Sequence, residues 1–186
     1  MYRSIKGYNL TDITGHWAES NIKQAVSGAI VTGYPDGTFK LNHTVTRAEF
    51  AVMLMNTMKL PGEGTKLSFV DTAKIGTWAQ KAVAQAVQAG IINGYEDKSF
   101  RPDAEITRAE MAVILANALG QHSESNVATG FADYKSIPAW AKDGIAYVKK
   151  AGIMQGKGAN EFAPQDHATR AEAVTVLLNM LATKSK

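Results

Sequence analysis

The sequence repeats one four-residue phrase, Thr-Arg-Ala-Glu, three times at nearly constant spacing. The phrase begins at Thr46, Thr107 and Thr169, so consecutive copies lie 61 and 62 residues apart (46 to 107, 107 to 169). Repetition at a fixed period indicates that one structural unit has been triplicated. A fold for this chain must therefore accommodate three equivalent units.

Other residues keep the same register around each copy of the phrase. An aspartate precedes a tryptophan, a glycine-centred turn follows, and a phenylalanine comes shortly before the phrase. The repeated positions are Asp12, Asp71 and Asp133; Trp17, Trp78 and Trp140; Gly33, Gly94 and Gly156; and Phe39, Phe100 and Phe162. We therefore divide the chain into three repeats spanning residues 8–60, 67–120 and 130–183.

Length and composition favour one soluble body built from these repeats. Each repeat has about 60 residues, a size at which a lone unit buries little apolar surface, so we expect the three to share a core. The chain is 45% hydrophobic and 20% charged, and it has no apolar run long enough to cross a membrane. Its net charge of +3 is compatible with an anionic partner but too small to indicate nucleic acid.

The ends of the chain and its lack of cysteine give weaker indications. Residues 1–7 lack the apolar core of a signal peptide, so in an exported protein they would begin a mature fragment with an added methionine. Residues 184–186 look like a cut through a linker. Zero cysteines exclude a disulfide framework and thiol catalysis, and fit many exported bacterial proteins.

The first helix of each repeat is predicted to begin near the tryptophan. Apolar residues at helical spacing predict helices over residues 17–30, 78–91 and 140–153. Gly90 and Gly152 stand where the second and third of these helices end, the usual place for a left-handed residue. The first repeat has Ala29 there. Either Ala29 adopts the left-handed conformation at a cost of roughly 1–2 kcal/mol, or Gly28 takes over by a one-residue slip.

The second helix of each repeat has a sharp start and an apolar body. The threonine of the phrase is an N-cap, and the glutamate three residues later completes a capping box. The segments that follow are apolar on nearly every side, which is typical of buried helices. We therefore predict a mainly α fold with these three helices at the centre and the tryptophan helices outside.

The arginines of the phrase, Arg47, Arg108 and Arg170, stand at an unfavourable place. A positive side chain beside a helix N-terminus opposes the helix dipole, at a cost of ~0.3–1 kcal/mol. An anionic partner would explain three such residues, because free N–H groups and a guanidinium together suit a carboxylate or phosphate. The alternative is an internal pair with the glutamate of the same phrase or with the repeated aspartate.

The tryptophans, aspartates and turn tyrosines also have two interpretations each. Each tryptophan is either a packing anchor or a platform for a sugar ring. Each aspartate either caps a helix or forms a turn, or accepts hydrogen bonds from a ligand. Tyr34 and Tyr95 lie in turns, so we expect them to be exposed and available. The third repeat lacks this tyrosine.

Signals for catalysis or metal binding are poor. The histidines fall at non-equivalent positions of the repeats: His16, His43, His122 and His167. The sequence has no zinc-ligand spacing, no phosphate-binding loop, no nucleophile elbow and no multi-aspartate calcium loop. We therefore expect neither an enzyme nor a cofactor or metal.

The combined pattern of Asp, Trp-Ala, Gly-Tyr-x-Asp-Gly-x-Phe and Thr-Arg-Ala-Glu resembles the S-layer homology (SLH) domain family. Three consecutive copies cover nearly the whole chain, about residues 8–183. The resemblance implies a three-pronged spindle of pseudo-threefold symmetry, with one helix of each repeat in a central bundle. It also implies an extracellular location, in the cell wall or S-layer of a Gram-positive bacterium.

The resemblance further implies a ligand and a site. In this family, grooves between prongs bind secondary cell wall polymers that end in pyruvylated N-acetylmannosamine, whose carboxylate is held by the arginine of the phrase. Carried over, Arg47, Arg108 and Arg170 hold the acid. The repeated aspartates and tryptophans, Gly33, Gly94, Gly156, Gly90, Gly152, Tyr34 and Tyr95 shape the grooves. The fragment is expected to be a monomer that tethers a surface protein non-covalently. The alternative is a module for self-assembly or protein–protein contact.

Two departures from the family pattern indicate that the three grooves differ. The methyl group of Ala29 could obstruct the approach of a ligand to the backbone. The third loop lacks the tyrosine and aspartate, so its groove is expected to bind weakly or differently. We further expect replacement of all three arginines by alanine to abolish polymer binding while leaving the fold intact.

Overall fold

The computed structural model describes residues 9–121 and 128–184. Within these residues the chain forms six α-helices and two short 3₁₀ helices, with isolated bridges in place of β-strands. The elements in chain order are α1 (Glu19–Ser27), α2 (Arg47–Met58), η1 (Thr72–Lys74), α3 (Thr77–Gln88), α4 (Arg108–Ala118), η2 (Tyr134–Ser136), α5 (Ala139–Lys150) and α6 (Arg170–Lys184). The expectations for residues 1–7, His122 and the final two residues lie outside the described part of the chain.

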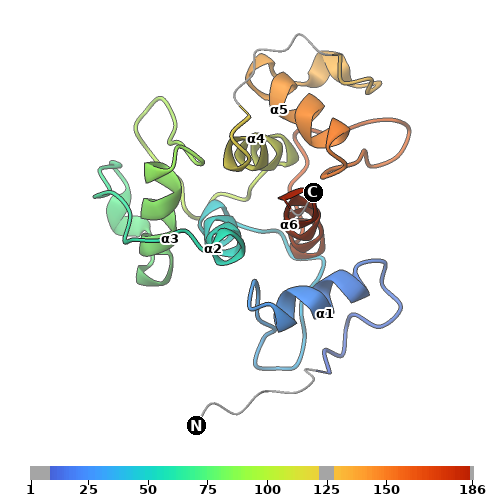
Figure 1. Cartoon of the computed structure of the whole chain (residues 1–186), viewed down its shortest axis with the longest axis horizontal. Coiled ribbons are helices and arrows are strands. Elements are labelled where there is room, and N and C mark those ends of the chain that lie inside the picture. Colours follow the sequence, from blue (N-terminus) through green and yellow to red (C-terminus); the bar gives the residue numbers. More distant parts are fainter. Residues whose placement is uncertain (1–8, 122–127, 185–186) are drawn as a thin grey trace.

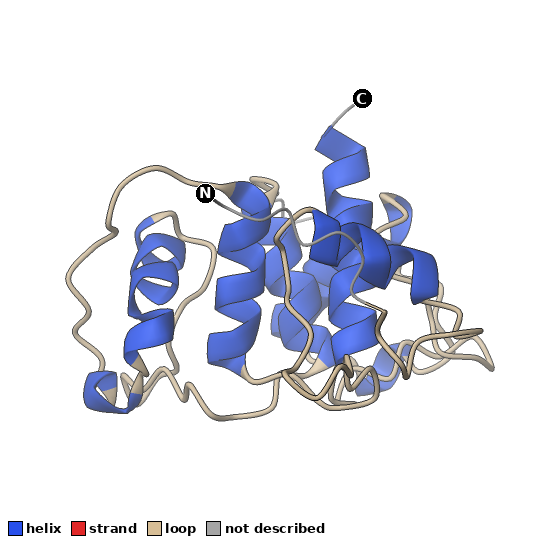
Figure 2. Ribbon diagram, turned by 90° about the horizontal axis from the view of Figure 1, so that it is seen from below, coloured by secondary structure: helices blue, strands red, loops and turns tan. Residues whose placement is uncertain are grey.

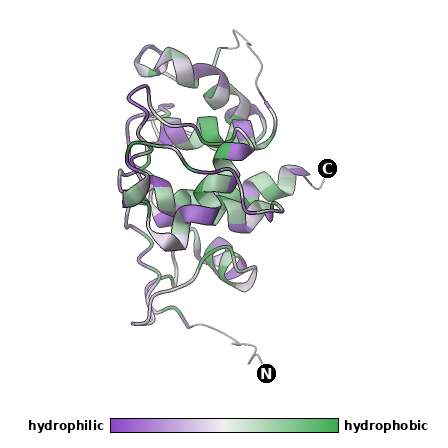
Figure 3. Ribbon diagram, turned by 90° about the vertical axis from the view of Figure 1, so that its left-hand side faces the viewer, coloured by the Kyte–Doolittle hydropathy of each residue, from purple (hydrophilic) through white to green (hydrophobic). Residues whose placement is uncertain are grey.

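The central and outer helices are placed as the sequence predicts. α2, α4 and α6 lie together at the centre, and α1, α3 and α5 surround them as three prongs (Figure 1). The central helices carry fully buried side chains such as Phe50, Leu115 and Leu177, and the apolar residues concentrate there (Figure 3). Many of the loops gather at one end of the molecule (Figure 2). None of the helices in the described residues combines the length and apolar character needed to cross a bilayer.

The prongs do not coincide with the sequence repeats. α3 of the second repeat packs on α2 of the first, and α5 of the third repeat packs on α4 of the second. The cycle closes because α1 of the first repeat packs on α6 of the third. Each outer helix therefore covers the central helix of the preceding repeat, and no repeat buries its own central helix alone.

A ring of backbone hydrogen bonds links the three repeats just before the central helices. The amide of Val45 donates to the carbonyl of Ala168 at 3.0 Å, that of Ala168 donates to Ile106 at 3.0 Å, and that of Ile106 donates to Val45 at 2.8 Å. Val45 and Ile106 are fully buried, as is Ala168. The ring therefore ties the repeats together at the pseudo-threefold axis.

The N-caps are confirmed, but the capping box is complete in one repeat. The hydroxyl oxygens of Thr46, Thr107 and Thr169 accept from the amide of the following glutamate at 3.1–3.2 Å. The reciprocal bond from the backbone to the glutamate forms at Thr107 and Glu110. In the described structure the other two repeats lack it, so the prediction of three complete boxes is wrong.

The left-handed helix ends lie where the glycine pattern places them. Gly90 and Gly152 have φ of +70° and +72°, and Ala29 has φ of +59°. Gly28 keeps a φ of −82°, so the one-residue slip does not occur. The first repeat therefore retains the backbone of the other two, and Ala29 carries the strain.

Replacing Ala29 by glycine should stabilise the fold by about 1 kcal/mol, because glycine adopts the left-handed conformation without the Cβ clash. Urea unfolding measures the change. A matched control is Ala89→Gly, whose backbone is right-handed with φ of −78°. That change should destabilise the protein by roughly 0.5–1 kcal/mol. A lower stability for Ala29→Gly would contradict the strain.

Candidate ligand-binding grooves

The repeated aspartates hold the loop that carries the repeated phenylalanine. Asp71 accepts from the amides of Phe100 and Arg101, each at 2.8 Å. Asp12 and Asp133 make the same pair of bonds at 2.8–2.9 Å in their own repeats. Both carboxylate oxygens are thus used by the backbone, which supports the turn-forming interpretation of these aspartates.

Asp71 should contribute to stability in a pH-dependent way. Burial disfavours its charged form, but the hydrogen bonds from the amides of Phe100 and Arg101 outweigh burial and hold the pKa of Asp71 below its ordinary value. Such a carboxylate stabilises the fold above its unfolded-state pKa of about 4, and this stability is lost as pH falls through the folded-state pKa.

The variant Asp71→Asn should therefore show a shallower fall in unfolding free energy in the acid range than the wild type. Urea unfolding at a series of pH values from neutral to about 3 measures the slope. Asp143→Asn is the control, because Asp143 is an exposed residue on α5. An unchanged acid slope in Asp71→Asn would count against the role of this carboxylate.

The repeated glycines before the turn allow close packing. A Cβ built at Gly94 would lie 2.5 Å from the ring of Phe69 and 2.8 Å from the carbonyl of Ser99. Gly33 and Gly156 meet comparable obstacles from Leu10 and Glu161. These glycines therefore let the loop press against its own repeat.

Each arginine of the phrase extends from the start of a central helix into the next repeat. Arg47 donates from Nε to the carbonyl of Phe100 at 2.9 Å and from Nη2 to that of Asn93 at 3.1 Å. Arg108 makes the matching bonds to the carbonyls of Phe162 and Gln155. Arg170 closes the cycle on the carbonyls of Phe39 and Thr32 in the first repeat. The three arginines are 5–8% exposed, so these contacts are buried.

The acidic partners of two arginines also come from the next repeat. Nη1 of Arg47 lies 2.7 Å from Oε2 of Glu110, and Nη1 of Arg108 lies 2.9 Å from Oε2 of Glu172. The prediction of a pair with the glutamate of the same phrase, or with the repeated aspartate, is therefore wrong. The arginines join neighbouring repeats.

The helix N-termini are already occupied. The amides of Arg47 and Ala48 donate to the carbonyls of Ala104 and Pro102 at 2.9 and 3.0 Å. The central helices of the other two repeats begin with the same pair of bonds. The expectation that free N–H groups assist the arginine in binding an anion is wrong. Nη1 of Arg47 and of Arg108 is also paired, with a glutamate, whereas within the described residues Arg170 has no carboxylate oxygen within 4.0 Å.

A groove forms where three repeats meet around Trp17. It has a volume of about 390 Å³ and is lined by Trp17, Arg108, Ile153, Met154, Gln155, Gly156, Lys157, Glu172, Thr175, Val176 and Asn179. We call it the Trp17 groove. The first repeat supplies its tryptophan, the second its arginine, and the third its loop and helix wall.

A second such groove, the Trp78 groove, is related to the first by the pseudo-threefold arrangement. It has a volume of about 330 Å³ and is lined by Trp78, Arg170, Ala29, Ile30, Val31, Thr32, Glu49, Val52, Met53 and Asn56. Both volumes are in the range of small-molecule sites. Ala29 lies in its wall, whereas a Cβ at the equivalent Gly90 or Gly152 would meet open space.

The tryptophans are not packing anchors. Trp17, Trp78 and Trp140 are 64%, 61% and 59% exposed. An indole ring in the wall of a groove offers a flat apolar face with one hydrogen-bond donor at its edge. The exposure therefore favours the platform interpretation of these residues.

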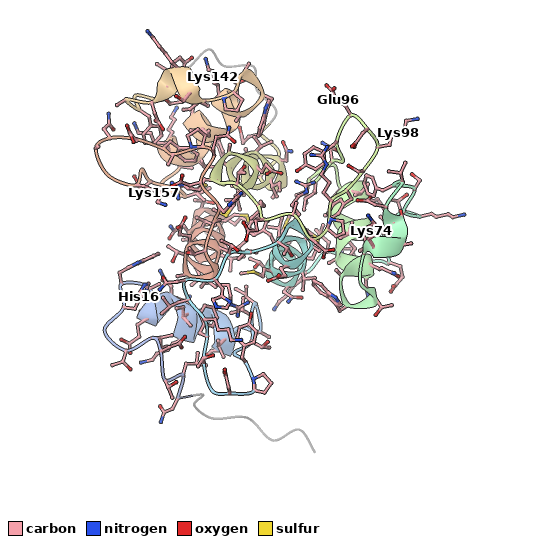
Figure 4. All side chains as sticks on the ribbon, turned by 180° about the vertical axis from the view of Figure 1, so that it is seen from behind. His16, Lys74, Glu96, Lys98, Lys142 and Lys157 are labelled. Atoms are coloured by element: carbon pink, nitrogen blue, oxygen red, sulfur yellow. The ribbon has the colours of Figure 1, made fainter. Side chains whose placement is uncertain are left out.

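The turn tyrosines are half-buried, so the prediction that they are exposed is wrong. The hydroxyl of Tyr95 donates to Oε2 of Glu110 at 2.7 Å, and its ring lies between Arg47 and Arg101. Burial, followed by the bond to Glu110, raises the pKa of Tyr95 to about 12. In the third repeat Lys157 replaces the tyrosine and pairs with Asp166 at 2.9 Å; Figure 4 labels it beside its loop.

Three equivalent asparagines, two of which line the grooves, were not predicted from the sequence. The side-chain amides of Asn56, Asn117 and Asn179 donate to the carbonyls of Ile30, Ile91 and Ile153 at 3.1–3.2 Å. Asn56 and Asn179 line the Trp78 and Trp17 grooves. Their spacing of 61 and 62 residues (56 to 117, 117 to 179) was the signal that could have revealed them.

The described residues contain no group of three or more acidic or histidine side chains placed to hold a metal ion. The grooves instead combine an exposed indole ring, a buried guanidinium and an amide, on a helical scaffold in which the repeats exchange partners. These features define a repeat-built module with candidate ligand-binding grooves.

Comparison with known proteins assigns this module to a family. The S-layer homology domain profile matches residues 9–51, 68–112 and 130–174. The chain belongs to the S-layer homology domain family.

Relatives carry the same segment within much longer proteins. The chain is 41% identical over 174 residues to the amylopullulanase of Thermoanaerobacterium thermosulfurigenes. This alignment covers 91% of the chain and 9% of that protein. The chain is 32% identical to S-layer protein EA1 of Bacillus anthracis, over 90% of this chain and 19% of that protein. It is 35% identical to the cellulosome-anchoring protein of Acetivibrio thermocellus, over 70% of this chain and 30% of that protein. The chain thus spans less than a third of each.

Family membership places the chain outside the cell, at the cell wall or S-layer. SLH domains are cell-surface anchoring modules that bind cell-wall polymers. They are non-catalytic, and relatives that are enzymes carry them as a separate part.

Proposed function

We propose that the chain anchors a surface protein by binding secondary cell wall polymer through its terminal pyruvylated N-acetylmannosamine. The observation that carries the proposal is the composition of the grooves. Each places an exposed tryptophan near a buried arginine of another repeat, in a space the size of a sugar. Arg47, Arg108 and Arg170 are proposed to hold the pyruvate carboxylate, as a guanidinium pairs well with that group.

The other repeated positions are proposed to contact the sugar or to hold the loop beside it. The tryptophan supports the apolar face of the sugar ring. Asn56, Asn117 and Asn179, whose side-chain nitrogens are held by backbone carbonyls, present their oxygens to hydroxyl or acetamido groups. The aspartates act through the loop, since both their oxygens are already bonded to it.

Calorimetry with the methyl glycoside of pyruvylated N-acetylmannosamine tests the proposal. Saturable binding is expected, with a strong loss of affinity for the same sugar without pyruvate, because the carboxylate is the partner of the guanidinium. Equal affinity for the two sugars would overturn the carboxylate contact, and no binding of either would overturn the glycan function. Incubation with wall glycan should release no product.

The alternative, a module for self-assembly, predicts a different behaviour in solution. Sedimentation of the chain without polymer should show a monomer if the exposed tryptophans serve a glycan. Concentration-dependent dimers that disappear on removal of Trp17, Trp78 and Trp140 would favour self-assembly.

Replacing Trp78 by alanine should lower the affinity of the Trp78 groove roughly tenfold, through loss of the ring face. The unfolding free energy should change by less than about 1 kcal/mol, because the side chain is 61% exposed. Calorimetry and urea unfolding measure the two effects. Tyr134→Ala, a change to an exposed aromatic residue outside both grooves, should leave the affinity as it is.

A further inference from the structure

The three buried arginines differ in one contact. Nη1 of Arg47 and of Arg108 is paired with a glutamate of the next repeat, Glu110 at 2.7 Å and Glu172 at 2.9 Å. Within residues 9–121 and 128–184, no carboxylate oxygen lies within 4.0 Å of the Arg170 guanidinium. Arg170 nevertheless keeps its bonds to the carbonyls of Phe39 and Thr32. Its position is therefore fixed while Nη1 lacks an acidic partner.

The equivalent glutamate, Glu49, lies in the same groove but has no oxygen within 4.0 Å of the Arg170 guanidinium in the described structure. Oε1 of Glu49 accepts from the hydroxyl of its own N-cap, Thr46, at 3.1 Å, as Oε1 of Glu110 does from Thr107, so the difference lies in the other carboxylate oxygen. In the second repeat the hydroxyl of Tyr95 and Nη1 of Arg47 both hold Oε2 of Glu110. Tyr34 makes no such bond to Glu49 in the described structure. Its ring faces Arg170 at 4.9 Å and Lys40 at 4.1 Å.

A paired glutamate is chemically the same group as the carboxylate of a ligand. The two compete for one guanidinium edge, and the glutamate has the advantage of being covalently held nearby. A ligand carboxylate that enters beside it also meets a like charge at short range. Direct pairing is absent at Arg170, because Glu49 lines the same groove but has no oxygen within 4.0 Å of the guanidinium in the described structure.

We propose that Glu110 and Glu172 are built-in competitors that occupy the carboxylate position of Arg47 and Arg108. The Trp78 groove, which contains Arg170, is therefore the site that a carboxylate-bearing glycan fills first. This inference rests on the proposed function. It adds that sites of similar composition differ in affinity, and that the presence or absence of a glutamate paired with the arginine sets the order of their affinities.

The indole N–H signals of Trp17 and Trp78 report the two grooves separately in NMR titrations with the methyl glycoside of pyruvylated N-acetylmannosamine. The Trp78 signal should shift at a ligand concentration at least tenfold lower than the Trp17 signal. The same order is expected in the Ala29→Gly variant, which removes a methyl group from the Trp78 groove wall. Simultaneous shifts, or an earlier shift of Trp17, would overturn the inference.

The variant Glu172→Gln keeps the shape of the side chain and removes its charge. It should raise the affinity of the Trp17 groove by tenfold or more and bring the Trp17 transition close to that of Trp78. Glu63→Gln is the control, because Glu63 is 84% exposed and outside both grooves. That change should move neither transition. An unchanged Trp17 transition in Glu172→Gln would also overturn the inference.

The outcomes separate this inference from the function on which it rests. If neither the wild type nor Glu172→Gln binds the glycoside, the proposed function fails and the inference fails with it. If the wild type binds with equal affinity in both grooves, the inference alone fails and the glycan function stands.

Discussion

A chain that ends at residue 121, and so lacks the third repeat, is expected not to fold cooperatively. The deletion removes α6, on which α1 packs, and α5, which covers α4. It also removes Ala168 from the backbone ring and both carbonyl acceptors of Arg108. The unfolding transition in urea should disappear, although two complete sequence repeats remain.

Mixing the fragment of residues 1–121 with that of residues 122–186 should restore the fold. Because the missing contacts are all made by the third repeat, the two pieces are expected to associate in equimolar amounts. Circular dichroism and sedimentation measure the recovery of helix and the mass of the complex. A sharp urea transition in the shorter fragment alone would show that the exchanged packing is dispensable.

Replacing Arg108 by alanine should destabilise the protein by about 3–5 kcal/mol. The change leaves the carbonyls of Phe162 and Gln155 without their donor, and it leaves Glu172, only 17% exposed, without its cation. A shift of the urea midpoint measures the loss. The substitution of all three arginines should therefore unfold the chain, which revises the expectation that such a variant keeps its fold.

Two further variants distinguish the hydrogen bonding of the Arg108 guanidinium from the effect of its positive charge. Arg101→Ala removes an exposed arginine that pairs with Asp97, and should change stability by less than about 1 kcal/mol. Arg108→Lys keeps the charge but cannot reach the three acceptors with one planar group, so it should recover only part of the loss. Full recovery by lysine would indicate that charge, and not the hydrogen-bonding fork, holds the repeats together.

The structural features that could be predicted from the sequence are those that depend on interactions between residues close together in the chain. The helix starts at Thr46, Thr107 and Thr169 and the left-handed residues at Gly90 and Gly152 follow from side chains acting on nearby backbone. The burial of the second helices follows from their apolar pattern. Each of these features can be recognised within a few residues of chain, so a single sequence is sufficient.

The relations between repeats could not be predicted in this way. A repeated sequence does not indicate whether a helix packs on its own repeat or on a neighbouring one. Both arrangements bring the same residue types together. The partners of Arg47, Arg108 and Arg170 were missed for this reason. The exposure of Trp17 and its counterparts was also hidden, since a large aromatic ring at a helix start is more often buried.

The ring of Val45, Ile106 and Ala168 also bears on how many repeats such a module can have. In an open solenoid, one more repeat adds to the end of the stack and finds the same neighbour as all others. Here the last repeat contacts the first, as in a closed rotational assembly. A fourth repeat would find no vacant partner. Gain or loss of these units during evolution is therefore expected to proceed by whole triplets.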